Sequence, residues 1–76
     1  MRLTETAFNN VQKYINGEKI ASFKRDREVI PLVKKFIENP TEEWALEIVR
    51  NNRYNIDAIE NPTQTVKDYH KLLWET

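Results

Sequence analysis

One pentapeptide, Ile-Glu-Asn-Pro-Thr, occurs twice in this chain of 76 residues, at 37–41 and at 59–63. Proline disfavours helical backbone in the residue before it, so a helix that reaches either copy has to end there. Threonine is a good helix N-cap, so a new helix can begin directly after each copy. The two copies begin 22 residues apart, which is a period typical of stacked helical repeats.

Apolar residues at helical spacing fill the segments between these breaks. They predict helices at Thr4–Asn16, from Asp26 through Ile37, at Thr41–Arg50, a shorter one through Ile56 and Ile59 that ends near Glu60, and at Thr63–Trp74. The first helix is built on a stripe that starts at Leu3, and Asn16-Gly17 favours a left-handed stop at its end. We therefore predict one all-α domain over residues 1–76, with four to five short helices in a small bundle or a truncated helical repeat.

A β-hairpin over residues 11–23 is the alternative for the first of these helices. Asn-Gly between short apolar segments is a strong signal for a two-residue hairpin turn. Helical spacing of apolar residues over three turns favours the helix, and the sequence alone leaves the hairpin open.

Composition narrows the classes of function. The chain has no Cys, so it has no disulfide framework and no thiolate chemistry, which fits a reducing cytoplasm. It lacks an apolar stretch that could cross a membrane, and it is too short for a second independent core. Its net charge is zero, but residues 1–38 carry +3 and residues 39–76 carry −3. We expect a cytoplasmic protein without a membrane partner, and self-association is a possible source of extra stability.

Two resemblances follow from the repeated motif and the residues between its copies. The first is to a helical repeat of unknown function found in phage and bacterial proteins. It is carried by Asn39-Pro40-Thr41-Glu42-Glu43, Val49-Arg50-Asn51-Asn52, Tyr54, Ile56, Ile59 and Asn61-Pro62-Thr63. Arg53 stands where that family tends to have Gly. The resemblance implies a helical-repeat architecture and a phage or mobile-element accessory protein, without any assigned chemistry.

The second resemblance is to the helix-turn-helix of lambda-repressor-like regulators. Thr41-Glu42-Glu43, followed by Ile56-Asp57-Ala58-Ile59-Glu60-Asn61, is similar to a capped helix and the end of a recognition helix. This resemblance implies DNA binding, with side chains that face the major groove at Asn52, Arg53, Tyr54 and Asn55. The scarcity of cations in this segment speaks against it, because Arg53 would be the only one to attract phosphates.

The residues offer little for catalysis. His70 is the single histidine and has no triad or metal-ligand spacing, and Gly17 is the only glycine, which excludes a glycine-rich phosphate loop. We therefore expect no enzyme and no cofactor, and a module that binds another macromolecule, most simply a protein. The expected contact residues are the basic side chains and one exposed aromatic ring, Lys24, Arg25, Arg27, Lys34, Lys35 and Trp74. Trp74 follows two leucines, and a helix cannot bury all three on one narrow face.

Overall fold

The computed structural model describes residues 1–17 and 26–75 and confirms the predicted all-α class. Four α-helices, one 3-10 helix (η1) and a two-stranded sheet follow one another along this part of the chain. Their bounds are β1 Arg2–Leu3, α1 Glu5–Ile15, α2 Asp26–Glu38, α3 Glu42–Asn51, η1 Arg53–Ala58, β2 Ile59–Glu60 and α4 Gln64–Glu75.

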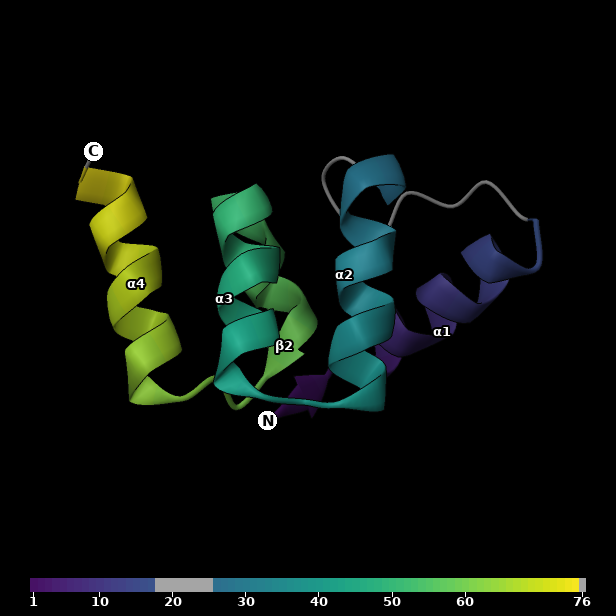
Figure 1. Ribbon diagram of the computed structural model, residues 1–76, viewed down its shortest axis with the longest axis horizontal. Helices are drawn as coiled ribbons and strands as arrows, with labels where there is room; N and C mark the ends of the chain where they lie inside the picture. Colours follow the sequence, from purple (N-terminus) through teal and green to yellow (C-terminus); the bar gives the residue numbers. More distant parts are fainter. Residues whose placement is uncertain (18–25, 76) are drawn as a thin grey trace.

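Three of the helices stand side by side in the molecule, with α3 between α2 and α4 (Figure 1). The helix η1 packs against both α3 and α4, and the small sheet lies at the lower edge of this view. The helix α1 lies beyond α2, at the opposite end from α4. The described residues therefore form an elongated row of helices, with principal extents of 35 × 23 × 17 Å.

Threonine caps begin three of the four α-helices. The hydroxyl oxygens of Thr4, Thr41 and Thr63 each accept a hydrogen bond from the backbone N–H three residues later. The Asn-Pro-Thr part of each pentapeptide copy thus does what the sequence predicts. The Ile-Glu part differs between the copies, because Ile37 and Glu38 end α2 whereas Ile59 and Glu60 form β2.

The cap of α3 leads to a first testable prediction. Replacing Thr41 by Ala is expected to lower the free energy of unfolding by about 1 kcal/mol, because the N–H of Trp44 loses its acceptor. Urea denaturation followed by circular dichroism measures the change. Thr65→Ala is the matched control, because Thr65 is exposed inside α4 and caps no helix. Equal losses in both variants would contradict the capping role.

The fourth predicted helix is partly wrong. Residues 53–58 form a 3-10 helix, and Ile59 and Glu60 leave it to pair with Leu3 and Arg2 in an antiparallel sheet. The N–H of Thr4 extends this pairing with a 2.9 Å hydrogen bond to the carbonyl oxygen of Ala58. Leu3, the first residue of the apolar stripe that predicted α1, is consequently buried in a strand.

In the described part of residues 11–23, the end of α1 contradicts the alternative β-hairpin. Tyr14 and Ile15 are helical, and the N–H of Gly17 donates to the carbonyl oxygen of Tyr14. Gly17 has a φ of +93°, the left-handed conformation that glycine adopts without a steric penalty. The other arm of the alternative hairpin, at 18–23, lies outside the described residues.

One continuous hydrophobic core joins these elements. It contains Leu3, Ala7, Val11, Val29, Ile30, Val33, Phe36, Ala45, Ile48, Val49, Ala58, Ile59 and Val66. The predicted helix faces supply most of this core, while the two strands add Leu3 and Ile59. Leu73 of α4 packs against the core from the edge, whereas the neighbouring Leu72 and Trp74 are exposed. The predicted exposure of part of this leucine–tryptophan run is confirmed.

Candidate functional site

An exposed tryptophan near the end of α4 is held by three neighbouring side chains. The indole Nε1–H of Trp74 donates to Nε2 of His70 over 2.7 Å. The Tyr54 ring meets the indole edge-on, with 5.3 Å between ring centroids. The guanidinium carbon of Arg53 lies 3.8 Å from the centroid of the indole and 5.7 Å from that of Tyr54. We call Arg53, Tyr54, His70 and Trp74 the Trp74 cluster.

Local structure explains why these four residues meet. His70 and Trp74 are four residues apart on α4, so their side chains lie one above the other on the same helix face. Arg53 and Tyr54 begin η1, and the Oδ1 of Asn52 fixes this start by accepting the N–H of Tyr54 at 3.0 Å. Because α4 packs against η1, the two pairs come together.

The cluster is ordered by its own contacts and is still open to solvent. Trp74 is 46% exposed and Tyr54 is 49% exposed. The indole N–H of Trp74 uses Nε2 of His70 as its acceptor. An aromatic side chain that is fixed before binding loses little conformational entropy when a partner covers it. The cluster therefore has the physical properties of a binding surface.

The sequence prediction had divided these residues between two different sites. It assigned Trp74 to a surface for a protein, and Arg53 and Tyr54 to contacts with DNA. The structure brings the three together. It does not bring Lys34 and Lys35 to Trp74, because these exposed lysines lie on α2 and α3 stands between α2 and α4 (Figure 1). Lys24 and Arg25 lie outside the described residues, and the side chain of Arg27 is not described either.

The other residues proposed for DNA contacts have local roles. Asn52 caps η1. Asn55 is only 3% exposed, and its Nδ2 donates to the carbonyl oxygen of Ile48 at 3.3 Å. The prediction that Asn55 faces the major groove is therefore wrong, because the amide lies inside the protein. A recognition α-helix is also absent from residues 52–61, which form η1 and β2.

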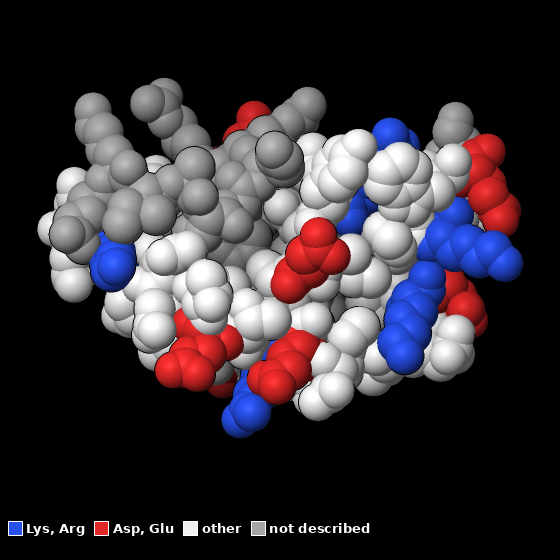
Figure 2. Space-filling view, turned by 180° about the vertical axis from the view of Figure 1, so that it is seen from behind, with Lys and Arg blue, Asp and Glu red and all other residues white. Residues whose placement is uncertain are grey.

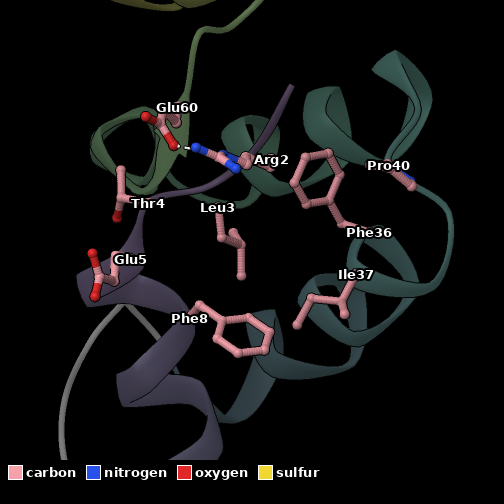
Figure 3. Close-up of a pocket in the computed structure, with 9 residues that line it drawn as sticks. All are labelled: Arg2, Leu3, Thr4, Glu5, Phe8, Phe36, Ile37, Pro40 and Glu60. Carbon is pink, nitrogen blue, oxygen red and sulfur yellow. Dashed lines mark hydrogen bonds and ion pairs between the residues drawn. The ribbon is translucent and has the colours of Figure 1, made fainter.

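A second surface, an apolar groove beside the sheet, was not predicted from the sequence. It has a volume of about 630 Å³, and Figure 3 shows Phe8 of α1 and Ile37 of α2 facing each other, with Leu3 pointing toward them from the side of Arg2. Phe36 and Pro40 complete its apolar lining. The only signal in the sequence was Phe8, which flanks the buried stripe of α1.

Charged side chains bound this groove. The Arg2 Nε donates to an oxygen of Glu60 at 2.8 Å. This hydrogen bond and the charge of Glu60 raise the pKa of the Arg2 guanidinium above its ordinary value. Glu5, at the start of α1, lines the groove as well. The groove is thus lined by both apolar and charged side chains, and it lies by the N-terminus rather than near Trp74.

The described residues contain no group of three or more His, Asp or Glu side chains that could hold a metal ion. None of the described helices is both long and apolar enough to span a bilayer. Comparisons with known proteins find no matching family model, curated protein or solved structure. The fold class is that of a small all-α protein, and the contacts around Trp74 are the basis for its proposed function.

Proposed function

We propose that this chain is a non-enzymatic, cytoplasmic module that binds another protein, with the Trp74 cluster at the centre of the contact. The observation that carries the proposal is a half-exposed tryptophan fixed by Arg53, Tyr54 and His70. Tryptophan, tyrosine and arginine are the residues most enriched among those that dominate binding energy at protein interfaces. The resemblance to the Asn-Pro-Thr repeat adds the proposal of a phage or mobile-element accessory protein.

The proposal predicts that binding depends on Trp74. Wild-type protein is immobilised, partners are captured from the source cell, and each captured protein is then purified and titrated. Trp74→Ala is expected to weaken binding by about 2 kcal/mol or more, which is about 30-fold in Kd. Sedimentation at two concentrations shows whether the partner is a second copy of the chain.

Leu72→Ala is the matched control for this experiment. Leu72 is exposed on the same helix and is not one of the four residues of the Trp74 cluster. Its replacement is expected to change Kd by less than about fivefold, since most interface positions contribute less than 1 kcal/mol. Partners that bind Trp74→Ala as tightly as wild type would overturn the proposed function.

DNA binding is the competing class, and the geometry favours it less. The predicted contacts Asn52, Arg53, Tyr54 and Asn55 include one buried side chain, and they form the N-cap and the first three residues of a six-residue 3-10 helix. The test is a shift of duplex DNA by the wild type that weakens steeply with salt and disappears in Arg53→Ala. A shift of this kind would replace the protein-binding proposal. If the wild type does not shift duplex DNA even at low salt, the DNA-binding proposal is wrong.

A further inference from the structure

The guanidinium of Arg53 has no carboxylate partner among the described residues. Its carbon lies 3.8 Å from the centroid of the indole of Trp74, so the charged group lies against the ring. Guanidinium groups stack on aromatic rings and present N–H donors in a rigid fork that matches a carboxylate. No carboxylate of residues 1–17 or 26–75 forms an ion pair with Arg53. This fork is therefore available to an incoming anion.

We propose that the Trp74 cluster binds an acidic side chain of the partner protein, next to an apolar side chain that covers the rings of Tyr54 and Trp74. This inference rests on the proposed function and specifies the chemistry of the partner. The carboxylate accepts hydrogen bonds from Arg53, whose position is already fixed by the stack. The exposed parts of the two rings supply the apolar contact, since both side chains are about half exposed.

The charges around the cluster favour one carboxylate over a polyanion. The exposed ionisable residues of α4 are Lys67, Asp68, Lys71 and Glu75, and η1 adds Asp57. Figure 2 shows that the described part of this face carries both signs of charge, interspersed. Residues 39–76 together carry −3, which weakens long-range attraction of a nucleic acid. Recognition of an anion therefore depends on direct contact with Arg53.

The backbone around the cluster favours a side-chain carboxylate over the C-terminus of a partner. C-terminal carboxylates are often captured by several free backbone N–H groups. Here the N–H of Tyr54 already donates to Oδ1 of Asn52, and the N–H of Asn55 donates to the carbonyl oxygen of Asn52. These two backbone N–H groups are therefore already used, and the guanidinium of Arg53 offers charged N–H donors instead.

A pair of capped peptides tests this inference. The first is Ac-Ser-Phe-Glu-Leu-Ser-NH2, and the second differs only by Gln in place of Glu. Binding is followed by NMR through the Trp74 indole N–H and the Arg53 Nε–H, with Trp74→Phe used to distinguish Trp74 from Trp44. The Glu peptide is expected to shift both signals at millimolar concentration. The Gln peptide is expected to bind about tenfold more weakly or not at all, because it lacks the charge-assisted hydrogen bonds.

Two variants separate the effect of the planar guanidinium donors on binding from the effect of positive charge alone. Arg53→Lys keeps the positive charge but loses the planar donor pair, and it is expected to bind the Glu peptide about tenfold more weakly. Lys71→Ala, which removes a cation outside the cluster, is expected to change binding less than about twofold. Unchanged binding by Arg53→Lys, equal binding of both peptides, or no binding of the Glu peptide would overturn the inference.

Other outcomes distinguish the two proposals from each other. If the Glu peptide does not bind while binding of the captured partners still requires Trp74, the proposal of an acidic side chain as the ligand is wrong. The proposed protein-binding function then stands. If oligothymidylate shifts the same two signals with a steep salt dependence, and the Glu peptide does not, the ligand is a nucleic acid and both proposals fall.

Discussion

Phe36→Ala is expected to lower the free energy of unfolding by about 3–5 kcal/mol, the range measured for large-to-small changes of buried aromatic residues. Phe36 is 1% exposed and is the largest of the fully buried side chains. Its helix, α2, packs against both α3 and β1, so the cavity would open where helices and sheet meet. For a chain of 76 residues the total stability is about 4–11 kcal/mol, and this one change removes a large part of it.

Urea denaturation followed by tryptophan fluorescence measures this loss as a shift of the unfolding midpoint. The matched control is Phe8→Ala, the same substitution at a ring that is 41% exposed on the wall of the apolar groove. We expect the control to lose less, about 1–2 kcal/mol, because a large part of the removed surface is already in water. A loss in Phe8→Ala as large as that in Phe36→Ala would show that the core is not centred where α2 meets α3 and β1.

The helices could be predicted because their signals are local. Apolar spacing within each segment and a threonine at each start determine α1, α3 and α4, whose observed ends lie within about one residue of the predicted ones. Pairing of β1 with β2 joins residues 58 positions apart, Arg2 and Glu60, and local periodicity contains no signal for such a contact. The strand at Ile59 replaced a predicted helix end for this reason.

The contacts of the candidate site could not be predicted from local sequence signals either. Exposure of at least one of Leu72, Leu73 and Trp74 could be predicted, since three consecutive apolar residues cannot share one buried face of a helix. The contacts of Trp74 with Arg53 and Tyr54 depend on how α4 packs against η1, about twenty residues earlier in the chain. The same packing makes one cluster from residues that the sequence had assigned to two functions. A basic stretch, by comparison, marks a solvated helix face and gives no information about what lies beside it.

Asn55→Asp is expected to be the second large change, with about 3–5 kcal/mol lost at neutral pH, as for a buried charge without a partner. Asn55 is 3% exposed, and its Nδ2 donates to the carbonyl oxygen of Ile48. A carboxylate cannot donate there, and burial disfavours its charged form. Burial would therefore raise the pKa of the new carboxyl above its unfolded value of about 3.9. The loss is then smallest below about pH 4 and grows as the pH rises toward the folded pKa.

Asn52→Asp is the control that makes this result specific, because it is the same substitution three residues earlier. Asn52 uses Oδ1 to accept the N–H of Tyr54, and an Asp carboxylate accepts that hydrogen bond equally well. We expect its free energy of unfolding to stay within about 0.5 kcal/mol of the wild type and to show little additional pH dependence. Equal stability of the two variants at neutral pH would mean that the side chain of Asn55 reaches solvent. Asn55 would then be a surface residue that could contact DNA, as the helix-turn-helix resemblance implies.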